Sequence, residues 1–212
     1  MGDEYDDVDH AGGLEVGIAA TGVRHDCRRF RKIVYQLPPM PIPLGGDMRY
    51  WEDANRQTTG GCGFWNTDIA WVLGTFAPAL KQAFIAGARL GSSAGQNVAV
   101  IDNTELFQGH KLCQNGATRT ADGTGAPPPT NAPDTFTTTE WVRGISVIQA
   151  EEAFTDQTTV GMHPMFWGQR ALAACAATAS VQMPATPSFS QYTCSLSNPT
   201  TLVDGTPAVS VS

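Results

Sequence analysis

The chain has 212 residues, with 13 basic and 20 acidic side chains and a formal net charge of −7. This acidic balance gives no electrostatic basis for binding a phosphate backbone, so nucleic acid is not expected as a partner. Hydrophobic residues make up 42% of the chain, and it holds 22 glycines and 14 prolines. The composition favours one loop-rich globular domain and excludes a coiled coil.

Two short apolar runs, residues 32–37 and 97–102, have the length and β-branched content of buried strands. Between them, apolar side chains recur every three or four residues, at Ile69, Val72, Phe76, Leu80, Phe84 and Ala88. This stripe predicts a helix over residues 66–90 that ends near Gly91, and Pro78 should either kink the helix or open its second half. The order strand, helix, strand predicts an α/β fold in which the two strands are parallel neighbours covered by the helix.

The second half of the chain is less regular. Residues 117–139 carry no periodicity and predict a long loop insertion. An alanine-rich stretch predicts a final helix over residues 166–179, and the Ser, Thr and Pro content of residues 180–212 predicts a disordered tail. The longest mostly apolar window, residues 76–90, is interrupted by proline and charged residues, so no membrane span is expected.

The N-terminus and the cysteines bear on metal sites and on the cellular compartment. The opening residues 1–10 are acidic, which is unlike a secretory signal, and they lack the spaced ligands and central glycine of a calcium loop. We interpret them as a solvated run and expect neither a metal nor a cofactor. No two of the five cysteines form a Cys-x-x-Cys pair, so disulfides are favoured over zinc and one cysteine is left over.

Four short segments stand in a distinctive order along the chain: residues 62–66 (CGFWN), 107–113 (FQGHKLC), 140–141 (EW) and 163–169 (HPMFWGQ). In this combination they resemble the secreted actinobacterial and fungal SGNH (GDSL-type) esterases and lipases. The resemblance covers roughly residues 31–179 and implies a three-layer α/β/α fold with a parallel sheet in a domain of residues 1–179. It also implies an extracellular protein, expected to be a monomer, that acts on a small ester, a lipid or an acetylated glycan.

The resemblance assigns roles to individual residues. His163 matches the family's catalytic base, and its place on a loop before a helix favours that role over a plain surface histidine. The acid often found three residues earlier is absent because Val160 stands there, so a dyad oriented by a backbone carbonyl is the remaining arrangement. Gly109, His110 and Trp167 fall in blocks that imply contact with substrate.

The resemblance also suggests cysteine pairings. Cys62 and Cys113 both flank family motifs, which implies a disulfide between them. Cys175 and Cys194 could pair across the tail, which would leave Cys27 without its usual partner.

The nucleophile is missing from its motif. Residues 1–5 (MGDEY) are similar to the family's Met-Gly-Asp-Ser-Tyr block, which places Glu4 at the serine position, although the same residues also read as a solvated terminus. The two blocks that supply the oxyanion glycine and asparagine appear deleted before residue 31, and Gly45 and Gly46 read as a turn instead. We therefore expect a truncated fold without its first strands, in which residues 1–30 are a remnant of the nucleophile block.

Two functions stay open after this comparison of motifs. The chain is either a carboxylic ester hydrolase with impaired catalysis, or a non-catalytic remnant or extracellular binding protein. Five tryptophans could line a ligand groove, yet packing in the core or at a rim is the favoured interpretation for Trp51, Trp65, Trp71, Trp141 and Trp167.

Overall fold

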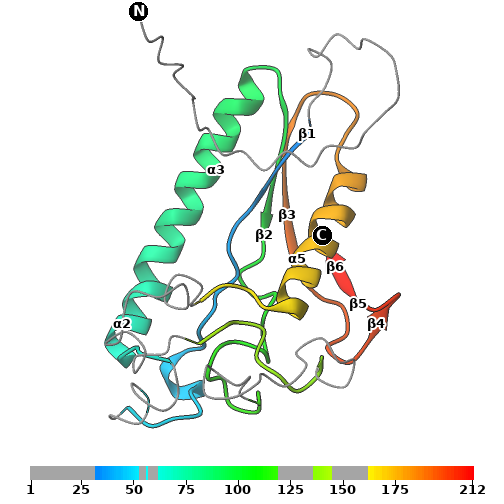
Figure 1. The fold of residues 1–212 in the computed structure, drawn as a ribbon. Helices are drawn as coiled ribbons and strands as arrows, with labels where there is room; N and C mark the ends of the chain where they lie inside the picture. The colour runs from blue at the N-terminus through cyan, green and yellow to red at the C-terminus, as the bar shows by residue number, and fades with distance from the viewer. Residues whose placement is uncertain (1–31, 53–55, 57–61, 119–135, 145–161) are drawn as a thin grey trace, which may run out of the picture.

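A computed structural model describes residues 32–52, 56, 62–118, 136–144 and 162–212. The mostly parallel sheet has the strand order β1-β2-β3-β6. Strand β2 pairs in parallel with both β1 and β3, and β6 closes one edge in antiparallel orientation (Figure 1). The strand bounds are β1 Lys32–Gln36, β2 Asn97–Asp102, β3 Phe189–Leu196 and β6 Val209–Val211. Two short strands, β4 Leu202–Val203 and β5 Thr206–Pro207, form a separate hairpin.

The two strands predicted from apolar runs are neighbours, as expected. Val34 of β1 lies opposite Ala99 of β2 in the parallel register. All six residues of β2 are buried, which explains why its sequence is a continuous apolar run rather than an alternating one. The α/β prediction with adjacent parallel strands is therefore confirmed.

The predicted helix between these strands is present but has an irregular middle. It consists of α2 Asn66–Trp71, a π-helical stretch η2 Val72–Phe76, and α3 Ala77–Ser93. Pro78 has no backbone N–H, and its ring would crowd the carbonyl of Gly74 in a regular α-helix. The wider π turn, closed by the Ala77 N–H on the Val72 carbonyl, lets α3 begin with the proline in its first turn. Pro78 thus opens the second half of the helix, which is one of the two predicted outcomes.

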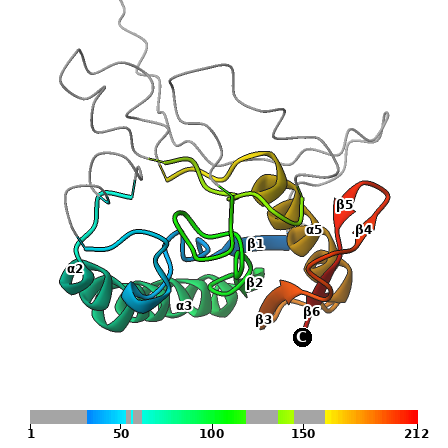
Figure 2. The ribbon, with the colours of Figure 1, turned by 90° about the horizontal axis from the view of Figure 1, so that it is seen from below.

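Helices cover both faces of the sheet. Ile85 and Ala88 of α3 pack on Val98 and Val100 of β2, whereas the final helix α5, Phe166–Gln182, packs with Ile101 on the opposite face. Figure 2 shows the sheet between α3 and α5. The predicted final helix is confirmed and runs to Gln182.

The prediction of a disordered tail over residues 180–212 is wrong. Strand β3 lies inside the sheet between β2 and β6, and Cys194 is fully buried. A disulfide joins Cys194 to Cys175 of α5, so the strand is fastened to the helix that precedes it. Three of the Ser and Thr side chains that suggested disorder, Ser190, Thr193 and Ser195, belong to β3, which β2 and β6 flank on its two sides.

Three other predictions have different outcomes. Residues Gly45–Asp47 form a short 3₁₀ turn, η1, as expected. The predicted loop 117–139 is described only at its two ends, which are joined by a bridge between Thr118 and Thr139. Residues 1–30, with Glu4 and Cys27, lie outside the described residues.

The continuous helical segment 66–93 is long and apolar enough to cross a membrane by length and composition, although the interrupted apolar window predicted no span. Only 11% of its most apolar window is buried inside the protein. This is weak evidence for a span, since a helix that packs on a sheet can pass the same test, and Ile85 and Ala88 of this helix do pack on β2.

The pairing of Cys62 with Cys113 is present in the structure and carries the first testable prediction. The bond closes a loop with a sequence separation of 51 residues, whereas Cys175 and Cys194 are separated by 19. On the chain-entropy model, replacing both Cys62 and Cys113 by Ala should lower the free energy of unfolding by about 4 kcal/mol, against about 3 kcal/mol for the other pair. Denaturant unfolding of the two double variants measures this order, and a larger loss for the Cys175 and Cys194 pair would contradict it.

Candidate functional site

The carboxyl edge of the parallel sheet is where ligands bind in open α/β folds. Three segments meet at this edge: the loop after β1, the turns after β2, and the loop that enters α5. The Leu112 N–H donates to the Pro41 carbonyl at 2.8 Å, and the Met165 N–H donates to the Trp141 carbonyl at 2.7 Å. These bonds bring residues far apart in sequence to the same edge.

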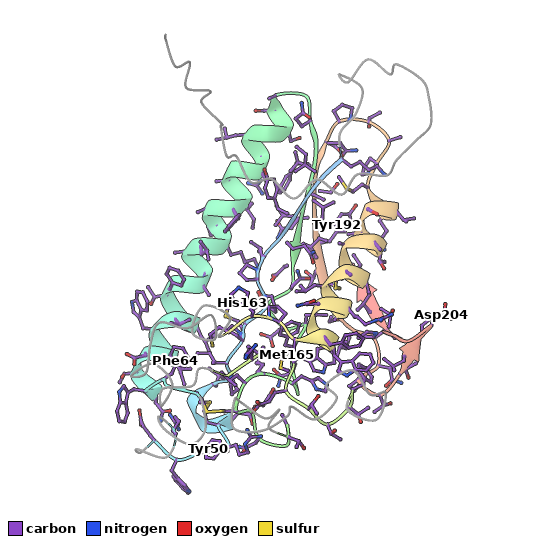
Figure 3. All side chains as sticks on the ribbon, in the orientation of Figure 1. Tyr50, Phe64, His163, Met165, Tyr192 and Asp204 are labelled. Carbon is purple, nitrogen blue, oxygen red and sulfur yellow. A yellow bond between two sulfur atoms is a disulfide. The ribbon has the colours of Figure 1, made fainter. Side chains whose placement is uncertain are left out.

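His163 lies on the loop that enters α5 and its side chain is exposed (Figure 3). Two backbone hydrogen bonds hold this loop: the Arg143 N–H donates to the His163 carbonyl at 3.0 Å, and the Met162 N–H donates to the Arg143 carbonyl at 2.9 Å. Val160 and Glu4 lie outside the described residues. The role of His163 as a base therefore stays a prediction, with its position at the carboxyl edge now known.

The other residues predicted to contact substrate have different surroundings. His110 and Trp167 are both 3% exposed and belong to an aromatic cluster in the core. The His110 ring stacks on Trp141 at 4.1 Å between centroids, and the Trp167 ring meets Phe136 edge-on at 5.5 Å. Gly109 is exposed and has a φ of +87°, a conformation that disfavours any side chain. Contact of these three residues with a substrate stays a prediction.

His110 is held in its neutral form. Burial lowers the pKa of His110 below its ordinary value, and a hydrogen bond with the Thr139 carbonyl only partly offsets this. The ring Nδ1 lies 2.9 Å from that carbonyl oxygen. Because a carbonyl can only accept, Nδ1 carries the proton of the neutral ring.

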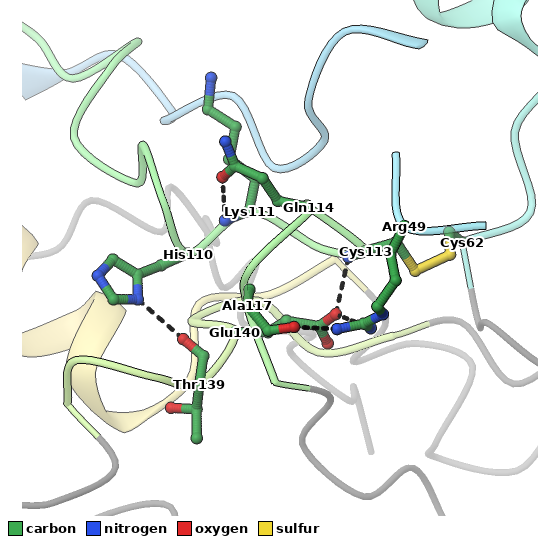
Figure 4. A network of polar contacts seen from close by, with 9 residues as sticks. All are labelled: Arg49, Cys62, His110, Lys111, Cys113, Gln114, Ala117, Thr139 and Glu140. Atoms are coloured by element: carbon green, nitrogen blue, oxygen red, sulfur yellow. Dashed lines mark hydrogen bonds and ion pairs between the residues drawn. A yellow bond between two sulfur atoms is a disulfide. The ribbon is translucent and has the colours of Figure 1, made fainter. Parts of the chain in front are cut away.

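Behind the edge lies a buried ion pair, shown in Figure 4. The carboxylate of Glu140, 2% exposed, accepts from Arg49 Nη2 at 2.6 Å and from the Cys113 N–H at 2.8 Å. Arg49 also donates to the Ala117 carbonyl, and its own N–H donates to the Cys113 carbonyl at 2.7 Å. The charge of Glu140 is therefore compensated by a cation and by a backbone donor.

A cavity of about 510 Å³ opens at the same edge, between the loop after β1, the first turns of α3 and the turns after β2. Its size is that of a small-molecule site. Its apolar lining comes from Leu37, Pro38, Met40, Pro43, Leu44, Leu73, Ala77, Pro78 and Leu80, and its polar lining from Asp47, Lys81, Gln82, Thr104, Glu105, Gln108 and Lys111. His163 is not among these lining residues.

A salt bridge organises the polar side of the cavity. Lys81 of α3 pairs with the carboxylate of Asp102 at the end of β2, and the Thr104 N–H donates to the same carboxylate at 3.0 Å. Burial raises the pKa of Asp102, but the hydrogen bonds from Lys81 and Thr104 outweigh it, so the net pKa lies below its ordinary value. Sequence reasoning missed this site, although a carboxylate at the carboxyl end of a buried strand was a usable signal.

The tryptophans divide into two groups. Trp141 and Trp167 are buried in the core, as the packing interpretation predicted. Trp51, Trp65 and Trp71 are 88%, 47% and 57% exposed, and Trp71 stacks on Phe76. Among the described residues, no group of three or more His, Cys, Asp or Glu side chains is placed to hold a metal ion.

Comparison of the chain with protein-family models, with curated proteins and with solved structures found no match.

The neutral state of His110 predicts a pH dependence of stability. In the unfolded chain the pKa of His110 is near 6.5, and burial lowers it in the folded protein, so the unfolded state binds a proton more readily. The contribution of His110 to the free energy of unfolding is therefore complete above pH 6.5 and is lost as the pH falls below that value. We expect the free energy of unfolding to fall between pH 7.5 and pH 5, by up to about 1.4 kcal/mol per pH unit. Denaturant unfolding of a His110→Gln variant should show a flatter profile, and parallel profiles would contradict this assignment.

The ion pair of Glu140 predicts a large effect from removing its cation. Arg49→Met leaves a buried carboxylate without its charge partner and should lower the free energy of unfolding by about 3 kcal/mol or more. The matched control is Lys32→Met, which removes an exposed cation that donates to the Ser180 carbonyl and should cost under about 1 kcal/mol. Similar losses for the two variants, measured by denaturant unfolding, would contradict the importance of the Glu140 pair.

Proposed function

We propose that this chain is a carboxylic ester hydrolase of the SGNH type by descent, with His163 as its retained base and with impaired catalysis. The supporting observation is the position of His163, which is exposed at the carboxyl edge of a parallel sheet, directly before the last helix. A base in such a place can reach a bound ester and a neighbouring nucleophile.

Two features of the sequence limit the proposed chemistry. Glu4 stands where the family resemblance expects serine, and a carboxylate there would place a negative charge where an oxyanion must form. The segments that the resemblance expects to donate hydrogen bonds to that oxyanion are missing from the sequence between residues 30 and 31. Base, nucleophile and oxyanion donors act as one unit, so the loss of two of them removes most of the rate.

The compartment is part of the same proposal. Two disulfides join Cys62 to Cys113 and Cys175 to Cys194. Disulfides persist in oxidising environments and are rare in the reducing cytosol. They support an extracellular location.

A non-catalytic binding protein is the second candidate function. The observation in its favour is the cavity at the carboxyl edge, which is formed without His163. A descendant of a hydrolase that lost its nucleophile could keep such a site for a ligand, since fold and chemistry are separable.

Hydrolysis of p-nitrophenyl butyrate by the full chain and by its His163→Ala variant tests the proposal. We expect turnover well below about one per second, the lower end of ordinary enzymes, with the residual rate reduced further in the variant. Glu4→Ser alone should rescue almost nothing because the oxyanion donors are still missing. Thermal melting of each variant controls for folding.

Two results would contradict the proposal in different ways. Turnover near about one per second that depends on His163 would mean that another serine acts as nucleophile and that catalysis is intact. Equal residual rates with and without the imidazole would leave His163 no role as a base and would favour the binding protein.

A further inference from the structure

The cavity at the carboxyl edge has two chemically different sides. One side is apolar and comes from the π turn, the start of α3 and the proline-rich loop after β1, through Leu44, Leu73, Pro78 and Leu80. Prolines restrict the backbone of both segments, so this side is largely formed before any ligand arrives. Leu44 also lines the cavity, and this large apolar side chain is 66% exposed to solvent.

The other side is polar and carries charges of both signs. Two lysines, Lys81 and Lys111, and two carboxylates, Asp47 and Glu105, line the cavity. Lys111 Nζ lies 3.2 Å from Glu105 Oε2, and Lys81 pairs with Asp102 behind the lining. Asp47 accepts from the Gln114 amide at 2.7 Å. Each lysine therefore already has a carboxylate partner.

The pairing of both lysines selects against a charged ligand. An anion would compete with Glu105 for Lys111 and would lie near Asp47, and a cation would lose hydration beside the ammonium groups of two lysines. An uncharged polar group avoids this cost, because the amides of Gln82 and Gln108 and the hydroxyl of Thr104 offer both donors and acceptors.

We infer that this cavity is a binding site for an uncharged, single-chain amphiphile, with its alkyl chain along Leu73 and Leu80 and its hydroxyl or ester end toward Thr104 and Lys111. The site needs no hydrolysis and no part of His163. A test of ligand binding at this cavity can therefore succeed or fail independently of a test of the proposed esterase activity.

Titration calorimetry of the full chain at pH 7.5 with three ligands that carry an eight-carbon chain tests the preference for an uncharged ligand. The probes are octan-1-ol, octanoate and octyltrimethylammonium, each below its aggregation concentration. We expect octan-1-ol to bind at least about tenfold more tightly than either charged ligand. Absence of octan-1-ol binding, or equal affinity for all three, overturns the inference.

Two variants of the same helix test the location. Leu80→Gln alters the lining of the cavity, whereas Leu90→Gln makes the same change on α3 at a side chain that is 72% exposed and outside the lining. The first should weaken octan-1-ol binding by at least about tenfold and the second should leave it unchanged. Equal affinities of the two variants would place the ligand elsewhere, and thermal melting confirms that both fold.

A charge change at an exposed residue tests the polar side. Glu105→Gln removes the carboxylate partner of Lys111 and takes one negative charge from the lining, and thermal melting checks that the variant folds. The affinity for octanoate should then rise by about tenfold while that for octan-1-ol stays the same. Unchanged octanoate affinity would show that Lys111 does not face the ligand and would overturn the orientation. His163→Ala should bind octan-1-ol as the unaltered chain does.

Discussion

The buried carboxylate of Glu140 is the interaction on which the carboxyl edge of the sheet depends. It joins three stretches that are distant in sequence: Arg49 after β1, Cys113 after β2, and Glu140 itself ahead of α5. The disulfide from Cys113 to Cys62 adds the start of α2 to the same point. Because a buried charge without partners is costly, the four segments hold their relative positions as long as the carboxylate is satisfied.

The candidate site follows directly from this arrangement. Trp141, next to Glu140, donates its N–H to the His110 carbonyl at 2.8 Å and accepts from Met165 at 2.7 Å. The loop with His163 is therefore linked to the ion pair through the Met165 hydrogen bond to Trp141, the residue that follows Glu140. On the other side, the Arg49 bond to Cys113 fixes the loop that carries Leu44 and Asp47 of the cavity. One electrostatic contact thus positions both the proposed base and the proposed ligand site.

Local sequence patterns predicted the elements in which the segment's own apolar residues indicate burial. Strands β1 and β2 and both long helices belong to this class, because an apolar run or a three-to-four-residue repeat is visible without neighbours. Strand β3 was missed since its residues, FSQYTCSL, are half polar and become a strand only between β2 and β6. The Lys81 and Asp102 pair was missed because it joins a helix to a strand 21 residues away.

The helical stripe shows where periodicity alone fails. A single face was predicted to carry Phe76, Phe84 and Ala88, yet Phe76 and Phe84 are 47% and 40% exposed, while Ala88 and Ile85 pack on the sheet. The π turn ahead of Pro78 adds a residue to one turn and so rotates everything after it relative to Ile69. Leu73, within the π turn, and Leu80, after it, both line the cavity. The turn that accommodates Pro78 therefore supplies part of the apolar side of the cavity, while Ile85 and Ala88 further along the same helix pack on the sheet.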